Sequence, residues 1–477
     1  MTEKNKAVKN VIWRSLEKFG SQGVSLLVSI VLARILDPSY YTTIAVTSIY
    51  LSIINVFVDG GFGSALIQKK DATEEDFSTV FYFNIALCIF MYILMFMLAP
   101  TIGRMYNDDL LVSVIRVQSL LILISSVKNV QKAYISRKMM FKKFFFATLL
   151  GTIGAAVLGV WMALAGFGVW ALVAQSLFNN LVDTIVLWIS VKWRPKFCFS
   201  IDSLKELFGF GWKLFAVNLL NVIYANLRQM IVGLKFSSLD LVYYNKGETL
   251  TRRAISDTVS SVEDVAFPLA SSHQDDKERL KQITRRVIRI STFICFPVLL
   301  GIASVADNLI SVVYTSKWLG CVPYLRIFCL TYLFYPIHVL SLNTIKSAGR
   351  SDVYLNLEII KKVSEVLLIA VAMQFNSYIL AFSSLVFIVA TLPLDLAPNK
   401  KIIGYSISEC FSDFLPNLAI ASVMAGVVYV IGFVKLSTLP LLICQIMTGV
   451  VVYIILAYIF QRSSFDYVMD VIVRKRR

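Results

Sequence analysis

Charge is scarce in this sequence. Only 16% of its 477 residues are Asp, Glu, Lys or Arg, whereas 57% are hydrophobic. Soluble proteins average about 25% charged and 45–50% apolar residues. The mean hydropathy is +0.72, and apolar runs recur from one end of the chain to the other. The composition therefore excludes an ordinary soluble domain and predicts a polytopic membrane protein.

Metal-ligating and disulfide-forming residues are also few. The chain has two histidines, His273 and His338, and seven cysteines that show no Cys-x-x-Cys spacing. Zinc sites need clustered ligands, and disulfide frameworks are typical of small secreted domains. We therefore expect no metal site and no other cofactor, and we interpret His338 as a packed or cavity-lining residue.

Catalytic motifs are missing as well. The sequence contains no GxxxxGK[ST] phosphate loop, no GxSxG and no HExxH. The acidic pairs Asp108–Asp109 and Asp275–Asp276 fall at predicted loop positions, where solvated charge is the usual explanation. No predicted loop is long enough to fold as a soluble domain. We therefore expect that the protein is not an enzyme.

The apolar runs predict an all-α polytopic membrane protein with about fourteen transmembrane helices, because about 20 apolar residues cross a bilayer. The segment 239–270 is the most polar of them and would need to be surrounded by other helices. The predicted spans are 15–36, 42–67, 77–99, 110–133, 144–166, 168–191, 207–234, 239–270, 288–314, 322–346, 354–374, 378–397, 412–434 and 439–461.

Lys and Arg in the short loops predict the orientation, because they are enriched on the cytoplasmic side. With the N-terminus inside, the opposite loops contain little more than Arg34, Arg104, Lys235, Lys317 and Lys435. The alternation predicts that both termini are cytoplasmic. It also explains most of the net charge of +16, so we expect no nucleic acid partner.

The charged insertion 192–206 divides the chain into comparable halves. Each half holds about six spans and begins on the same side, which is typical of a parallel repeat in transporters. We therefore predict a six-helix lobe at 1–200, a second six-helix lobe at 201–405, and two additional C-terminal helices with a basic tail at 406–477.

A polar ladder runs along the first predicted span. Its members recur every three or four residues and so share one helix face: Asn10, Arg14, Lys18, Gln22, Ser25 and Ser29. Cations within a span normally face a water-filled cavity or a partner. We interpret the ladder as the wall of a polar pathway; the alternative is that Arg14 and Lys18 extend to the headgroups.

The second half repeats this pattern. Lys213 and Arg228 lie on one face of the span that opens it, and Arg252 and Arg253 follow in the next span. A cavity with several cations suits an anionic, sugar-bearing ligand, because Arg binds phosphate oxygens bidentately. The alternative for the arginine pair is internal ion pairing with acids one turn away.

Two intramembrane acids have two alternative interpretations. Asp59 precedes a glycine cluster at the depth of Lys18, and Asp183 lies within the sixth span. Each carboxylate either exchanges H⁺ or Na⁺ during transport or neutralises a neighbouring cation. For Asp59 we favour a pair with Lys18 or Arg14.

Ordered segments across most of the chain resemble the Wzx-type polysaccharide-unit flippases, which serve lipopolysaccharide, O-antigen and exopolysaccharide synthesis. These flippases belong to the multidrug/oligosaccharidyl-lipid/polysaccharide exporter superfamily. The segments that carry the resemblance include LARILDP (32–38), DGGFGSALIQKKDATEEDFSTVFYFN (59–84), KWRP (192–195), FGFGWKLF (208–215), FPVLLGIASVADNLISVVYTSKW (296–318) and SAGRSDVYLNLEIIKKV (347–363).

The resemblance implies two six-helix lobes with two added helices that alternate between inward- and outward-open states. It implies that the substrate is an oligosaccharide repeat unit on undecaprenyl pyrophosphate, moved across the bacterial inner membrane from the cytoplasmic to the periplasmic leaflet. The expected partners are this lipid-linked substrate, membrane lipids, a coupling ion (H⁺ or Na⁺) and polysaccharide assembly proteins. The alternatives are a drug exporter of the same superfamily, a membrane-embedded polymerase or ligase, and a scaffold without transport.

Overall fold

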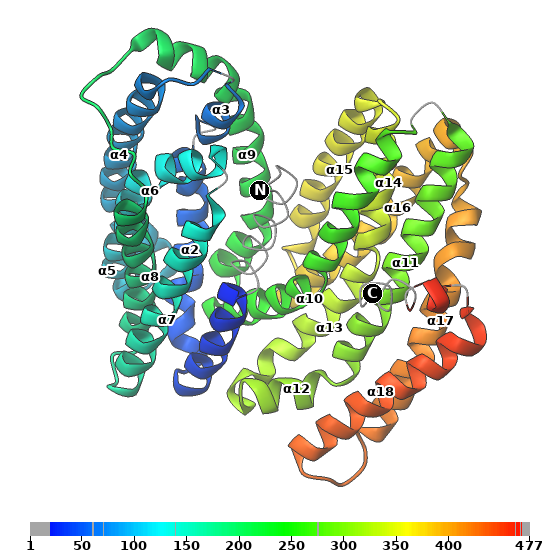
Figure 1. Cartoon of the computed structure of the whole chain (residues 1–477). Coiled ribbons are helices and arrows are strands. Elements are labelled where there is room, and N and C mark those ends of the chain that lie inside the picture. The colour runs from blue at the N-terminus through cyan, green and yellow to red at the C-terminus, as the bar shows by residue number, and fades with distance from the viewer. Residues whose placement is uncertain are drawn as a thin grey trace. The chain divides into compact units, whose positions relative to one another are not determined.

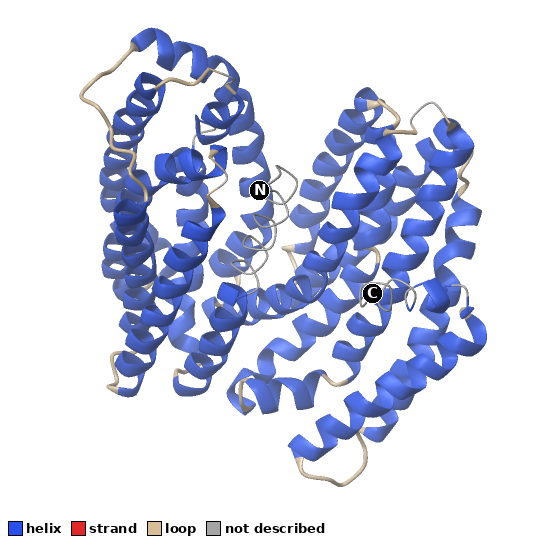
Figure 2. Cartoon of the chain, viewed as in Figure 1, coloured by secondary structure: helices blue, strands red, loops and turns tan. Residues whose placement is uncertain are grey.

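A computed structural model describes residues 20–59, 62–69, 71–138, 140–273, 276–462, 464–467 and 469. Every regular element within these ranges is a helix, as Figures 1 and 2 show. The predicted all-α fold class is confirmed.

The contacts within the chain divide it into two compact units, between Val242 and Tyr243. The first unit begins with helical residues Gly20–Ile35 and continues with α2 (Pro38–Asp59), α3 (Phe62–Gln68), α4 (Glu74–Tyr106), α5 (Asp109–Gln118), α6 (Leu120–Arg137), α7 (Phe141–Leu164), α8 (Val169–Ser190) and α9 (Ile201–Lys235).

The second unit contains most of α10 and all later helices. Its elements are α10 (Ser238–Ser271), α11 (Lys277–Ser304), α12 (Ala306–Val313), a 3₁₀ helix (Ser316–Cys321), α13 (Val322–Leu333), α14 (Tyr335–Ser347), α15 (Ser351–Ala372), α16 (Ser377–Ile403), α17 (Ile407–Ile431) and α18 (Thr438–Phe460). The predicted lobes 1–200, 201–405 and 406–477 stay a prediction, because contacts in one conformation do not test which parts move together.

Within the described ranges, ten helical segments are long and apolar enough to cross a membrane. They coincide with ten of the predicted spans. Two of the ten are broken helices: α5 and α6 meet at Ser119, and the 3₁₀ helix leads into α13 and α14. The other four predicted spans correspond to Gly20–Ile35, α9, α10 and α15, of which the last three carry more charge.

Apolar side chains cover much of the outside of the helices. Met97 in α4, Leu164 in α7 and Ile189 in α8 are 70–77% exposed. Large exposed apolar surfaces of this kind mark contact with a membrane or a partner. This surface and the ten apolar helical segments together identify the chain as a multi-pass membrane protein.

Capping interactions determine where α4 begins. Thr73 Oγ1 accepts a hydrogen bond from Asp76 N, and Asp76 Oδ2 accepts one from Thr73 N at 2.9 Å, which forms a capping box. Lys69 Nζ donates to Asp76 at 3.1 Å and to Glu206 of α9 at 2.8 Å. The hydrogen bond to Glu206 raises the pKa of Lys69. The residues after α3 are thereby tied to both α4 and α9.

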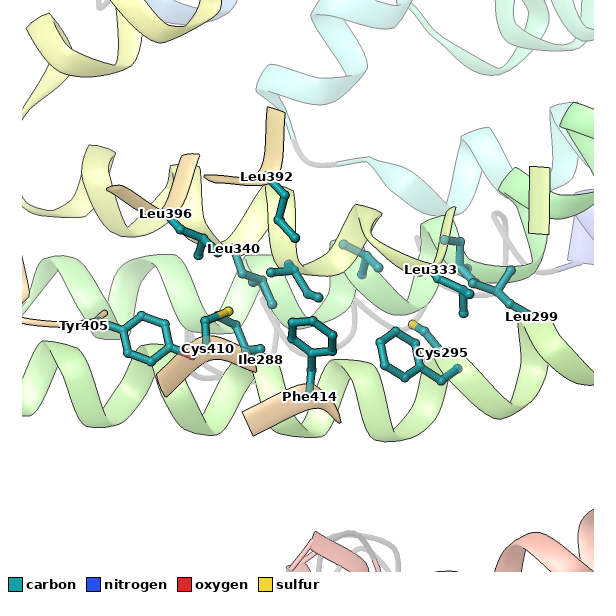
Figure 3. Close-up of a cluster of buried hydrophobic side chains, with 14 of the residues drawn as sticks. Ile288, Cys295, Leu299, Leu333, Leu340, Leu392, Leu396, Tyr405, Cys410 and Phe414 are labelled. Atoms are coloured by element: carbon teal, nitrogen blue, oxygen red, sulfur yellow. The ribbon is translucent and has the colours of Figure 1, made fainter. Parts of the chain in front are cut away.

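Each unit has its own apolar core. In the second unit, Ile288 and Leu299 of α11, Leu340 of α14, Leu396 of α16 and Phe414 of α17 are buried against one another (Figure 3). In the first unit, Trp193 of the KWRP segment is buried between Phe77, Phe81 and Tyr134. The segment that joins α8 to α9 is therefore part of the packed structure.

Candidate functional site

Several predicted site residues lie outside the described part of the chain. Arg14 and Lys18 precede residue 20, and the side chains of Asp59 and Lys213 are also outside the described residues. Their predicted roles, as cavity cations and as an ion-coupling or pairing carboxylate, stay predictions.

The two C-terminal members of the polar ladder line a cavity. Ser25 and Ser29 border a space of about 280 Å³. The polar residues on its other walls come from α2, α7 and α8: Tyr41, Thr152, Gln175, Ser176 and Asn179. These hydroxyl and amide groups can donate and accept hydrogen bonds, so this part of the first unit can hold water or the hydroxyl groups of a ligand.

Gly151 determines how closely α7 and α8 approach each other beside this cavity. A Cβ atom on Gly151 of α7 would lie 2.8 Å from Asn179 Oδ1 and 2.9 Å from the backbone oxygen of Asn179 in α8. Real Cβ atoms do not approach so closely. Gly151 therefore permits α7 and α8 to touch beside the cavity-lining Asn179.

Asp183 belongs to a buried ion pair in the same unit. Lys128 Nζ of α6 lies 2.9 Å from Asp183 Oδ2 and donates to Asn180 Oδ1 at the same distance. The two charged side chains are 6% and 14% exposed. The contact with Lys128 is compatible with charge pairing, one of the two roles predicted for Asp183. Whether it also exchanges an ion stays a prediction.

The cations of the second basic face fall in different units. Arg228 of α9 is buried in the first unit, whereas Arg252 and Arg253 of α10 are exposed in the second. Their convergence with Lys213 on one cationic cavity stays a prediction.

On α10 the structure shows a further cation, the half-buried Lys246. Its Nζ lies 3.9 Å from the ring centroid of Tyr314 and 4.9 Å from that of Trp318. Aromatic faces attract cations, and Trp318 is fully buried. Sequence reasoning missed this site, because the two rings are about 70 residues away along the chain.

A second charged cluster lies between α14, α15 and α16. Lys361 Nζ is 3.2 Å from Asp395 Oδ1 and 3.3 Å from His338 Nε2. His338 Nδ1 contacts the other oxygen of Asp395, and Lys361 also pairs with Glu358 one turn earlier. Asp395 is fully buried. His338 is therefore packed beside charged groups, and the charged residues in the predicted span that forms α15, Lys361 among them, were the signal that could have revealed the cluster.

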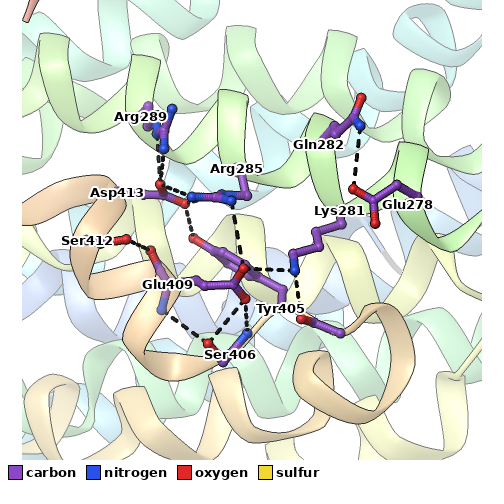
Figure 4. A network of polar contacts seen from close by, with 11 residues as sticks. Glu278, Lys281, Gln282, Arg285, Arg289, Tyr405, Ser406, Glu409, Ser412 and Asp413 are labelled. Carbon is purple, nitrogen blue, oxygen red and sulfur yellow. Dashed lines mark hydrogen bonds and ion pairs between the residues drawn. The ribbon is translucent and has the colours of Figure 1, made fainter.

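A third network joins α11 to the start of α17 (Figure 4). Arg285 Nε and Arg289 Nε donate to Asp413 at 2.9 and 2.8 Å, and Tyr405 Oη donates to the same carboxylate at 2.9 Å. Asp413 is buried. Three donors in a partly buried setting stabilise its charge, so this network ties the two helices together at their charged ends.

Within the described residues, no group of three or more His, Cys, Asp or Glu side chains could hold a metal ion. The charged groups form ion pairs and hydrogen bonds inside helix bundles, and the first unit also contains a cavity with polar side chains on its walls. Such an arrangement can bind and guide a polar solute through a membrane protein.

Comparison with known proteins decides the family. A sequence profile described as "polysaccharide biosynthesis protein" matches residues 31–323, more than half of the chain. The chain belongs to this polysaccharide biosynthesis family. The resemblance to Wzx-type flippases is thereby confirmed at the level of the family.

Three relatives in this family are similar in sequence. The teichuronic acid biosynthesis protein TuaB of Bacillus subtilis is 27% identical over 62% of this chain and 62% of its own length. The succinoglycan biosynthesis transport protein ExoT of Rhizobium meliloti is 25% identical over 68% and 65%. The lipopolysaccharide biosynthesis protein WzxC of Escherichia coli is 23% identical over 69% and 67%. The chain thus spans less than two thirds of the length of TuaB and of ExoT.

Solved structures show the same fold over almost the whole chain. The lipid II flippase MurJ, in an inward closed conformation, matches with a TM-score of 0.78 and 16% identity, covering 95% of this chain and 99% of MurJ. An inward-facing multidrug resistance MATE transporter of the MOP superfamily matches with a TM-score of 0.60 and 13% identity, covering 82% and 98%. At these identities the similarity establishes the fold.

Proposed function

We propose that this protein is a flippase for lipid-linked oligosaccharides. It moves undecaprenyl-pyrophosphate-linked repeat units from the cytoplasmic to the periplasmic leaflet of the bacterial inner membrane, by alternating access through a cationic central cavity. The observation that carries the proposal is family membership combined with a fold that matches a lipid II flippase over 95% of the chain.

Intramembrane charge supports an anionic substrate. Arg228 is buried within α9, and Arg252 and Arg253 are carried by α10, the most polar of the predicted spans. Arginine binds phosphate bidentately, so these side chains, with Arg14, Lys18 and Lys213, are the proposed contacts of the pyrophosphate. The hydroxyl and amide groups beside Ser25 and Ser29 suit sugar hydroxyls.

Transport against a gradient needs an energy source. We propose coupling to H⁺ or Na⁺, with Asp59 and Asp183 as the two candidate carboxylates. Asp183 lies in an ion pair with Lys128, and for Asp59 a pair with Lys18 or Arg14 is the alternative that we favour. The same proposal places both termini in the cytoplasm and allows contact with polysaccharide assembly proteins.

The decisive experiment is deletion of the gene followed by extraction of lipid-linked oligosaccharides. We expect a complete repeat unit to accumulate, facing the cytoplasm, and surface polysaccharide to disappear until the gene is restored. A drug exporter would instead give drug sensitivity without this accumulation. A polymerase or ligase would leave single repeat units on the periplasmic face. Either of those results would refute the flippase assignment.

A further inference from the structure

Two cavities follow one another along a single helix, α11. The first has a volume of about 410 Å³ and is lined by Gln282, Arg285, Arg286 and Arg289, with Ser464 and Tyr467 opposite. The second has a volume of about 380 Å³ and an almost entirely apolar lining. The first cavity is therefore cationic and the second is apolar.

The two cavities share one face of α11. Positions 282, 286 and 289 line the first cavity and 297 and 301 line the second, at spacings of three, four or eight residues, which are close to whole helix turns. Between the cavities, Phe293 packs against Tyr453 of α18, with ring centroids 5.5 Å apart, and its backbone oxygen accepts a hydrogen bond from Tyr453 Oη at 2.6 Å.

The residues opposite α11 also follow one another along the chain. Residues 446, 450 and 453 of α18 line the apolar cavity, and Ser464 and Tyr467 beyond it line the cationic one. Residues of α11, of α18 and of the segment after α18 thus line the two cavities, and Leu309 of α12 with Met424 and Val428 of α17 complete the apolar one.

The cationic end has more positive than negative charge. Arg285 and Arg289 share the single carboxylate of Asp413. The Arg286 guanidinium lies over the ring of Tyr467, 4.1 Å from its centroid. Tyr467 is uncharged, so three guanidinium groups face one carboxylate.

The neighbouring ion pair does not remove this excess. Lys281 Nζ lies 2.8 Å from Glu409, which is also 3.7 Å from Arg285. Counting this pair and Glu278, which accepts a hydrogen bond from the cavity-lining Gln282 at 3.5 Å, four cations stand against three carboxylates among the described residues here, which leaves one positive charge in excess. Such a site has the charge and the donors to bind a phosphate group.

We propose that these cavities hold an anionic glycerophospholipid of the bilayer. Its phosphodiester binds at Arg286, Arg285 and Arg289, and an acyl chain occupies the apolar cavity. Basic pockets between transmembrane helices bind anionic headgroups in this way.

The spacing fits such a lipid. Pro297, the first α11 residue of the apolar cavity, follows Arg289 by eight residues, or ~12 Å at the rise of an α-helix. This is less than half of the ~30 Å hydrocarbon thickness, so an acyl chain reaches the near end of the apolar cavity within one leaflet. The far end, at Val305, lies ~24 Å from Arg289 along the helix.

A resident lipid is a different ligand from the transported one. The cations proposed to bind the substrate pyrophosphate belong to other helices than α11. The inference therefore does not rest on the flippase function, and lipid binding can be measured without transport.

The experiment is native mass spectrometry of the purified full-length protein in detergent. The probes are phosphatidylglycerol, phosphatidylethanolamine, undecaprenyl phosphate and inorganic phosphate. We expect phosphatidylglycerol to bind about tenfold more tightly than phosphatidylethanolamine, because the arginines that bind the phosphodiester of either lipid repel the ammonium group of phosphatidylethanolamine.

Two variants test the two ends. Arg286→Gln removes a cation without breaking a salt bridge to Asp413, and we expect phosphatidylglycerol affinity to fall about tenfold. Gly301→Leu fills the apolar cavity, since a Cβ there comes no closer than 3.9 Å to Met424 Cε, and it should also weaken binding. The control is Arg279→Gln, the same charge change at an exposed position of α11.

Three results would overturn the proposal. The first is equal phosphatidylglycerol binding by the wild type, Arg286→Gln and Gly301→Leu. The second is undecaprenyl phosphate displacing phosphatidylglycerol from the site, which would assign it to the carrier lipid. The third is inorganic phosphate binding as tightly as the lipid, which would assign it to a free anion.

Discussion

At the scale of single residues, the charged side chains inside the helix bundles have the largest expected effects on stability. Lys128 of α6 pairs with the partly buried Asp183, and Lys361 of α15 pairs with the fully buried Asp395. Burying an ion pair costs desolvation energy that its attraction only partly offsets. Forming such a pair therefore adds little to the free energy of unfolding. Removing one partner lowers it strongly, because the other charge stays in the bundle without a partner.

Lys361→Met tests this at the cluster of α14, α15 and α16. The substitution leaves Asp395 buried beside a second acid, Glu358. We expect the free energy of unfolding to fall by about 3–5 kcal/mol, measured as the midpoint of unfolding in mixed detergent and SDS micelles.

The double variant Lys361→Met/Asp395→Asn removes both charges and should recover most of the lost stability. Arg350→Gln, which breaks an exposed pair with Asp352, should leave the midpoint unchanged. A Lys361→Met protein as stable as the wild type would show that the buried pair does not form.

At the scale of elements, close helix contacts depend on glycine. The α7–α8 contact at Gly151 is limited by the backbone oxygen of Asn179, which cannot rotate away as a side chain could. Gly426 of α17 is the opposite case, because nothing lies within 4 Å of a Cβ placed there. The two glycines are therefore a matched pair.

Gly151→Ala should force α7 and α8 apart and lower the free energy of unfolding by about 1–3 kcal/mol. Gly426→Ala should raise it by about 0.5–1 kcal/mol, because alanine loses less backbone entropy in a helix. Thermal unfolding followed by size-exclusion chromatography measures both. Shifts of the same sign would contradict the contact at Gly151.

At the scale of the whole molecule, the proposed cationic pathway is the feature to test. We expect Arg14→Ala, Lys18→Ala and Lys213→Ala to reduce surface polysaccharide about tenfold or more, since each removes a charge-assisted contact with pyrophosphate. The protein level in the membrane should not change.

The assay is complementation of the deletion strain, with surface glycan and protein quantified together. The matched control is Lys435→Ala, an exposed lysine just after α17. Normal glycan in all three variants at wild-type protein level would refute the assignment of these cations to the substrate.

The membrane fold could be read from the sequence because it depends on local composition. A window of about 20 apolar residues must cross the bilayer whatever its neighbours are, and ten predicted windows match apolar helices of the structure. The polar face of Ser25 and Ser29 was also predictable, since helix periodicity alone places them together. The ordered motifs likewise indicated the family that the profile match confirms.

The partners of the charges could not be read in this way. Lys128 and Asp183 are 55 residues apart, and Lys361 and Asp395 are 34 apart. The packing of separate helices decides which intramembrane charges meet. No local sequence pattern encodes the distance between side chains on different helices. Composition and periodicity thus determined the class, the spans and one polar face. Tertiary packing decided which charges neutralise one another and left the arginines of α11 in excess beside an apolar cavity.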